Sequence, residues 1–91
     1  MKVREFQIED IPHLVHLMDQ LGYPTSLEKL EIRLSNIQSQ ANYHTLVAEL
    51  DNKVVGMVGL CHNLFYEYDS SYVRIVAFIV DIIGVRELEK D

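Results

Sequence analysis

Glu67 and Asp81 are the two carboxylates whose positions suit proton transfer. Glu67 lies in a polar stretch between two apolar runs, and Asp81 ends the most apolar run of the chain. A carboxylate beside a substrate site could take a proton from a protonated amine as a general base. Carboxylates at such positions are also commonly solvated loop groups. The sequence leaves both interpretations open for both residues.

Histidine and cysteine could bind a metal ion, but their spacing argues against it. His13 and His16 lie three residues apart in a helical pattern, close enough to share an ion, yet no third ligand accompanies them. Cys61 and His62 are adjacent in an extended run, so their side chains point to opposite faces of a strand. We therefore predict no metal site and expect Cys61 to be a small core residue.

The composition predicts one globular domain, residues 1–91, in the cytoplasm. The chain is 48% hydrophobic and 24% charged, with a net charge of −6. Clustered cations, which nucleic-acid binding requires, are missing, whereas an acidic surface mildly favours a cationic substrate. The single cysteine excludes an internal disulfide and fits a reducing compartment. No segment resembles a signal peptide, and the longest apolar run, Ile75–Val80, is too short to cross a membrane.

Two helices are predicted near the N-terminus, after a short strand in 2–7. Apolar residues at helical spacing form one stripe in each helix: Ile11, Leu14, Val15, Met18 and Leu21 in the first, and Leu27, Leu30, Leu34 and Ile37 in the second. Asp10 is the expected N-cap of the first helix, and Gly22 its left-handed end. Thr25 and Glu28 form the expected capping box of the second helix. Leu14, Met18, Leu30 and Leu34 are expected in the core.

Three strands are predicted in the remainder of the chain. They cover 43–50, 53–66 and 72–81, with a tight turn at Asp51 and Asn52 and with bulges or close approaches at Gly56 and Gly59. The last strand is the most apolar, which predicts that other parts of the chain cover it on both faces. The predicted fold is α+β, in the order β-α-α-β-β-β, with a four-stranded antiparallel sheet and two helices packed on it.

Three stretches, in order and at these separations, resemble the opening of a GNAT-family acetyltransferase. They are Val3–Glu5 running into Ile8–Pro12, the hairpin Leu46–Gly56, and the strand Tyr72–Asp81 with its ending Phe-Ile-Val-Asp. The resemblance covers residues 1–81 and implies the family's N-terminal half, an α/β sandwich. The remaining residues, 82–91, are a divergent tail.

The resemblance implies acetyl-CoA as the cofactor. In this family the backbone near the end of the fourth strand pairs with the pantetheine arm and the acetyl carbonyl, and the matching residues are Phe78, Ile79 and Val80. The family then has Arg or Gln, two residues, Gly, one residue, and Gly or Ala, a loop that holds the pyrophosphate. Ile82–Asp91 has one glycine, and its Arg86 follows that glycine. We therefore expect a chain truncated before this loop, with weak or absent acetyl-CoA binding.

The resemblance also locates an acceptor pocket, in which a small amine would bind. Its residues here are Leu21, Gly22 and Tyr23, together with Phe65, Tyr66 and Tyr68. Each set also has an ordinary interpretation, as a helix cap and as strand-end aromatics. The predicted function is acetyl transfer from acetyl-CoA to an amine, with this chain inactive. The alternative is a non-catalytic remnant that forms a homodimer or binds a partner, since Tyr72–Asp81 would be an unguarded edge strand able to pair with its copy.

Overall fold

The computed structural model describes residues 1–81, and its elements follow the predicted order. They are β1 (Lys2–Glu5), a 3₁₀ turn η1 (Ile8–Asp10), α1 (Ile11–Gln20), α2 (Leu27–Gln38), β2 (Tyr43–Leu50), β3 (Lys53–Leu64) and β4 (Ser71–Val80). The four strands pair antiparallel in the order β1-β2-β3-β4. The predicted α+β fold is therefore confirmed, and the divergent tail 82–91 lies outside the described residues.

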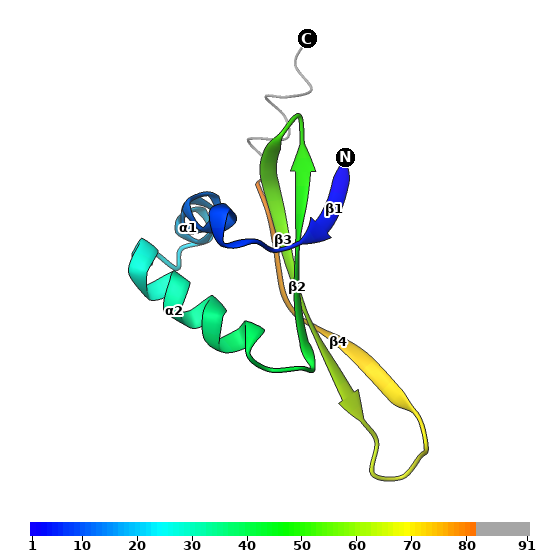
Figure 1. The fold of residues 1–91 in the computed structure, drawn as a ribbon. Coiled ribbons are helices and arrows are strands. Elements are labelled where there is room, and N and C mark those ends of the chain that lie inside the picture. The colour runs from blue at the N-terminus through cyan, green and yellow to red at the C-terminus, as the bar shows by residue number, and fades with distance from the viewer. Residues whose placement is uncertain (82–91) are drawn as a thin grey trace.

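Both helices lie on one face of the sheet, and the strands β3 and β4 reach well beyond them (Figure 1). Asp51 and Asn52 join β2 to β3 with positive φ values of 52° and 64°, as the tight-turn prediction required. The β3–β4 hairpin projects away from the helices as a long arm (Figure 1). The molecule thus has a packed end and a projecting end.

The core lies between the helices and the sheet. Its members are Phe6, Ile11, Leu14, Leu17, Leu30, Leu34, Val47, Val54 and Ile79. Leu14, Leu30 and Leu34 confirm the prediction, whereas Met18 is only partly buried. Leu17, which the stripe omitted, is fully buried, and Leu21 is exposed. The rest of the stripe is confirmed, since Ile11 and Leu14 are buried and Val15 and Met18 pack against the core. Leu21 fails because it lies just beyond the end of α1 at Gln20.

One predicted helix cap is wrong, and another lacks the expected bond. Asp10 is the N-cap residue of α1 as predicted, but its side chain makes no cap bond, because its carboxylate accepts hydrogen bonds from Arg4 and from the backbone N–H of Gln7. The N-cap of α2 is Ser26 rather than Thr25, since the Ser26 hydroxyl accepts from the Lys29 N–H at 3.1 Å. Gly22, with φ of 90°, does end α1 as predicted.

Strand β4 is not covered on both faces, contrary to the prediction. Every residue from Ser71 to Val76 is exposed, and Ile79 is the only buried residue of the strand. The helices reach β4 only near its C-terminal end, because α1 is short and the arm extends past it. In residues 1–81 no strand pairs with the outer edge of β4.

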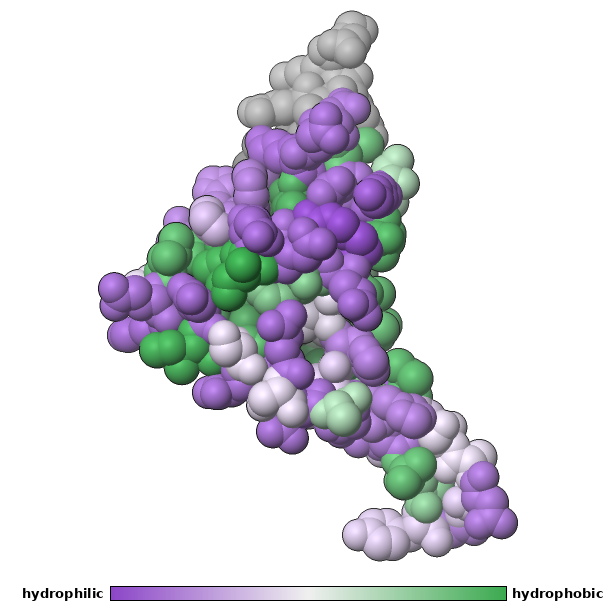
Figure 2. Space-filling view, in the orientation of Figure 1, coloured by the Kyte–Doolittle hydropathy of each residue, from purple (hydrophilic) through white to green (hydrophobic). Residues whose placement is uncertain are grey.

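The sheet face that points away from the helices is bare within residues 1–81. Strand register places Val3, Ala48, Gly56 and Val80 side by side on it, and Leu46, Val58 and Phe78 in the next row. Figure 2 shows apolar side chains along this margin of the molecule, opposite the helices. A shallow depression of about 380 Å³ lies on this face, lined almost wholly by apolar side chains.

An ionic cluster ties β1, η1 and β2 together. The Arg4 guanidinium donates to both carboxylate oxygens of Asp10 at 2.7 and 2.8 Å, and its Nε donates to Glu49 at 2.7 Å. The bonds from Arg4, joined by the one from the Gln7 N–H, lower the pKa of Asp10, and burial only partly opposes them. The same bonds, led by the one to Asp10, raise the pKa of Arg4.

The buried leucines should dominate stability. Replacing Leu14 or Leu34 by Ala should cost about 2–5 kcal/mol of unfolding free energy, because each leaves a cavity in a small core. Denaturant unfolding of these variants, beside Ile32→Ala on the exposed face of α2, measures this. A Leu14→Ala variant as stable as Ile32→Ala would show that the helix faces are misassigned.

The ion pair between Asp10 and Arg4 should make the unfolding free energy depend on pH. Because the folded-state pKa of Asp10 is lowered, its contribution is complete above the unfolded-state value of about 3.9 and is lost as pH falls through the folded-state pKa. Asp10→Asn should therefore destabilise the fold by roughly 1.5–3 kcal/mol at pH 7, with a smaller difference from the parent at pH 3. Urea titrations at both pH values test this, with the exposed Asp19→Asn as control. A pH-independent difference would contradict it.

Candidate active site

The residues predicted to meet acetyl-CoA lie at the C-terminal end of β4. Phe78 and Val80 are exposed on the bare face, whereas Ile79 is part of the core. On their inner edge they pair with Val58, Met57 and Gly56 of β3. Their outer edge has no strand partner within residues 1–81, so alternate backbone N–H and C=O groups there face outward. This edge can offer backbone donors and acceptors, but not the Ile79 side chain.

A bulge precedes this end of β4. Gly59 pairs with Ala77 and Leu60 with Ile75, which leaves Val76 as the extra residue of β4. A Cβ on Gly59 would come within 3.3 Å of the Ala77 Cβ and 3.4 Å of a Val76 methyl, so this glycine makes room for the bulge. A bulged residue is unpaired and bends its strand. The sequence pointed to Gly59, but it gave no sign that the extra residue lies on β4.

A second irregularity involves Gly56. Ala48 pairs with Gly56 and Glu49 with Val54, so Val55 is the extra residue of β3. A Cβ on Gly56 would lie 3.1 Å from the carbonyl oxygen of Ile79. The close backbone approach expected at Gly56 is therefore confirmed, and it holds β3 against the predicted acetyl-CoA segment.

The two candidate bases are far apart in the fold. Asp81 follows β4, is buried, and donates its backbone N–H to the Val55 carbonyl at 2.7 Å. It already has an interaction partner and is not a free carboxylate. Glu67 is exposed in the loop at the tip of the arm. The structure brings only Asp81 close to Phe78–Val80.

The predicted acceptor residues form two separate groups. Leu21, Gly22 and Tyr23 lie in the α1–α2 connection, where the Tyr23 N–H donates to the Met18 carbonyl. Phe65, Tyr66 and Tyr68 lie at the tip of the β3–β4 arm, far from that connection (Figure 1). Among the depressions found on the described residues, none is lined by members of both groups. Within residues 1–81 the two groups therefore lie apart, and the acceptor pocket remains a prediction.

The aromatic residues of the arm pack on one another. The ring centroids of Phe65 and Tyr72 lie 4.7 Å apart. The rings of Phe65 and Tyr68 meet edge-on, with their centroids 5.5 Å apart. Phe65 and Tyr68, with His62, Leu64 and the loop residues Asp69–Ser71, line a shallow depression of about 450 Å³. Aromatic faces beside carboxylates attract organic cations. The tip therefore combines aromatic rings with the Asp69 carboxylate, at a distance from the predicted acetyl-CoA segment.

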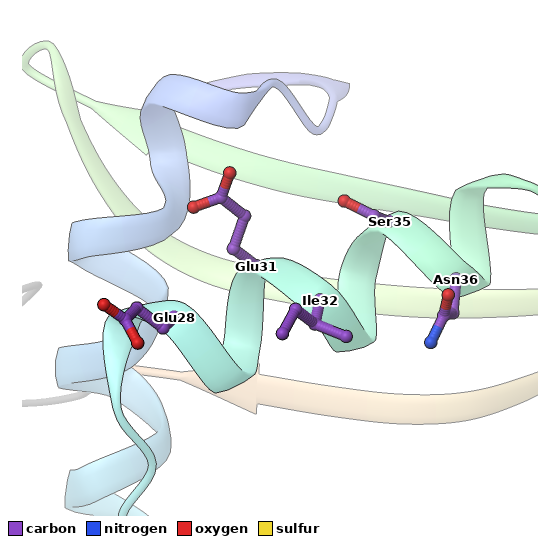
Figure 3. A pocket seen from close by; sticks show the side chains of 5 residues that line it. All are labelled: Glu28, Glu31, Ile32, Ser35 and Asn36. Carbon is purple, nitrogen blue, oxygen red and sulfur yellow. The ribbon is translucent and has the colours of Figure 1, made fainter.

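The outer face of α2 carries another depression, of about 410 Å³, and it makes no site. Glu28, Glu31, Ile32, Ser35 and Asn36 line it, all from this one helix (Figure 3). Their side chains stand along the helix and do not converge on a common point (Figure 3). Such a surface has neither the enclosure nor the convergent polar groups of a ligand pocket.

The histidines and the cysteine have ordinary roles in the described part of the chain. His16 hydrogen-bonds to Gln20 at 3.1 Å, and Cys61 is buried between the side chains of Asn42 and Asn63. His62 is exposed, so it lies on the opposite face of β3 from Cys61, as predicted. Residues 1–81 contain no group of three potential metal ligands. Within the same residues, neither α1 nor α2 is long and apolar enough to span a bilayer.

Comparisons with known proteins identify the relatives of this fold. No family model and no curated protein matches the sequence. A GNAT family acetyltransferase from Staphylococcus aureus is 34% identical, with a TM-score of 0.82, and the match covers 97% of this chain and 72% of that one. A putative acetyltransferase from Agrobacterium tumefaciens (TM-score 0.80, 16% identity) is matched over 99% of this chain and 72% of its own.

An aminoglycoside 6′-N-acetyltransferase from Acinetobacter haemolyticus shares the fold more distantly. Its TM-score is 0.68 at 13% identity, over 98% of this chain and 69% of that one. At such low identity this match speaks for the fold alone. The match to the Staphylococcus aureus protein extends to the amino-acid sequence, which is 34% identical over 97% of this chain. The chain therefore belongs to the GNAT family of acetyltransferases.

Proposed function

We propose that this chain contributes to the transfer of an acetyl group from acetyl-CoA to an amine, and that by itself it binds acetyl-CoA weakly. The observation that carries the proposal is the outer edge of β4 at Phe78–Val80, which is unpaired within residues 1–81 and follows a bulge. An edge of this kind suits a ligand rich in amides, such as a pantetheine arm, because both offer alternating donors and acceptors.

The proposed contribution of this edge to catalysis is electrostatic stabilisation. Acetyl-CoA supplies an activated acyl group whose carbonyl oxygen gains negative charge when an amine attacks it. A backbone N–H at the bulge or at Phe78–Val80 is suited to stabilise that oxygen, because a fixed donor needs no reorganisation during the reaction. Val76 has no partner residue in the register with β3, and the residues beyond it have no strand partner on the outer edge within residues 1–81.

Three features support weak binding and low activity of this chain. Arg74 is the only cation in β4, whereas the pyrophosphate of coenzyme A needs cations or a nest of N–H groups. Ile82–Asp91 lacks the family's pyrophosphate-loop pattern and lies outside the described residues. Of the two candidate bases, Asp81 already has an interaction partner and Glu67 is remote from Phe78–Val80.

We also propose that the protein is cytoplasmic. Its single cysteine is buried and forms no disulfide, which fits a reducing compartment.

Calorimetric titration with acetyl-CoA tests the proposed weak binding. The chain should bind at least about a hundredfold more weakly than the Staphylococcus aureus relative, because roughly 3 kcal/mol of pyrophosphate contacts corresponds to two decades of affinity. Both proteins should be titrated in the same buffer. Equal affinities would overturn the proposed role of the missing loop pattern.

A second candidate function is a non-catalytic module that forms a homodimer or binds a partner. It is favoured by the exposure of the apolar strand β4 along its outer edge. Edge strands of soluble proteins are usually guarded by prolines, inward charges or bulges. Here Arg74 is the only charge in β4 and proline is absent from it, although the bulge at Val76 supplies a guard that the sequence did not reveal.

Sedimentation velocity distinguishes this candidate from a monomeric chain. The chain should sediment as a dimer at high micromolar concentration, and Ile75→Lys should shift it to monomer by adding a charge to the apolar edge strand. Ile32→Lys, on the outer face of α2, is the matched control, because both side chains are 63% exposed. Ile79 is unsuitable for this test because it lies in the core. A parent monomer, or a dimer that Ile75→Lys leaves unchanged, would exclude this function.

A further inference from the structure

The peptide group that joins Ile79 to Val80 lies against a glycine of β3. Strand register pairs Gly56 with Val80, and a Cβ added to Gly56 would lie 3.1 Å from the Ile79 carbonyl oxygen. The next nearest atoms, the Ala48 Cβ and a Val80 methyl, would be at ordinary contact distances of 3.7 and 3.9 Å. Among the glycines of residues 1–81 only Gly22 has a positive φ. The backbone at Gly56 would therefore accept alanine, and the contact with the Ile79 oxygen is what opposes it.

The pairing with β3 determines which way this peptide group points. The Asp81 N–H donates to the Val55 carbonyl at 2.7 Å, one residue beyond the Gly56–Val80 pair on each strand. In an antiparallel ladder this makes Gly56 and Val80 a non-hydrogen-bonded pair, so the Ile79 carbonyl points toward β3. The C=O and N–H of a planar trans peptide point in opposite directions, and the described residues contain no cis peptide. The Val80 N–H therefore points away from β3, whatever lies beyond it.

Neither side of this contact can move aside freely. The Ile79 side chain is 6% exposed and packs in the core with the leucines of α1. The bond from Asp81 to Val55 holds the strand just beyond Ile79. Gly56 is itself buried between β2 and β4. A methyl group on Gly56 would have to displace the Ile79 oxygen by a few tenths of an ångström, and the rigid peptide would carry that displacement to the Val80 N–H.

The other glycine of β3 has a different relation to β4. A Cβ on Gly59 would meet side chains first, the Ala77 Cβ at 3.3 Å and a Val76 methyl at 3.4 Å. Both belong to the bulge, where the regular ladder is already interrupted. Side chains there can shift without turning a paired peptide group. Gly59 thus makes room for the bulge, whereas Gly56 faces a carbonyl whose peptide also carries an outward N–H.

We propose that Gly56 is a positioning residue for acetyl-CoA. Because it has no side chain, the Ile79–Val80 peptide can lie close against β3, and this directs the Val80 N–H toward an amide oxygen of the pantetheine arm. The strength of a hydrogen bond depends on its length and angle, so a small displacement of the donor weakens it. The inference rests on the proposed binding of acetyl-CoA at Phe78–Val80. The direction of the peptide itself follows from the pairing with β3.

NMR titration with acetyl-CoA, which also measures weak binding, tests the positioning role. Gly56→Ala should bind about twofold to tenfold more weakly than the parent chain, because one neutral hydrogen bond contributes on that order. Val54→Ala is the matched control, since Val54 is a buried core residue of the same strand and its truncation places nothing against the Ile79 carbonyl. It should be less stable than the parent but bind equally well. An unchanged affinity of Gly56→Ala, or an equal loss in Val54→Ala, would overturn the proposal.

Amide spectra recorded without ligand distinguish this inference from the proposed function. The Val80 N–H resonance should shift more than that of Ala77 in Gly56→Ala, and less than that of Ala77 in Gly59→Ala. If the parent binds acetyl-CoA but the Val80 resonance is unmoved in Gly56→Ala, the positioning role fails and the proposed function stands. A parent chain that binds no acetyl-CoA contradicts the proposed function, and the positioning role falls with it. A Gly56→Ala chain that does not fold, beside a folded Val54→Ala, would show that the contact serves the fold alone and would also overturn the proposal.

Discussion

Leu14 and Leu17 of α1 share one core with Val47 of β2 and Ile79 of β4, and this packing determines which parts of the sheet are supported. Apolar burial stabilises only the strands that the helices reach. Because α1 contains ten residues, it covers β4 near Ile79 and stops short of the arm. The C-terminal end of β4 is thereby fixed from the helix side, and its start is left to the hydrogen bonds of a two-stranded ribbon.

The ionic cluster at Arg4 serves the same packed end. It connects β1 to the entrance of α1 through Asp10 and to β2 through Glu49, so the first strand and the first helix keep a fixed relation to the sheet. A carboxylate as buried as that of Asp10 would be costly without its partners. Its bidentate bond with Arg4 and its bond from the Gln7 N–H together account for its oxygens.

Local sequence signals predicted the fold well where local chemistry decides it. Asp51 and Asn52 accept positive φ at little cost, and Gly22 accepts it more readily still, so the turn and the helix end were correctly located. Signals that depend on distant partners failed. Asp10 is the N-cap residue of α1, but Arg4 on β1 binds its carboxylate, so the expected cap bond is not made. The misplaced cap of α2 is a local exception, because Thr25 and Ser26 differ only in which hydroxyl the backbone brings to the Lys29 N–H.

The same distinction between local and long-range signals explains which features of the candidate site could be predicted. The apolar run of β4 was recognisable from sequence, but its coverage was not, because coverage depends on how far the helices extend over the sheet. The separation of Phe65 and Tyr68 from Phe78–Val80 follows from the length of the β3–β4 hairpin and from its pairing register, neither of which a motif records.

The bulge at Val76 gives the two halves of β4 different properties. Before it, the outer edge is regular, apolar and supported on one side only, which favours addition of another strand. After it, the close approach of Gly56 to the Ile79 carbonyl and the burial of Ile79 hold the strand from its inner side. The outer backbone groups there can remain rigid without a strand partner. A ligand that needs fixed N–H and C=O groups requires that combination, and a uniformly paired strand of the same sequence would not provide it.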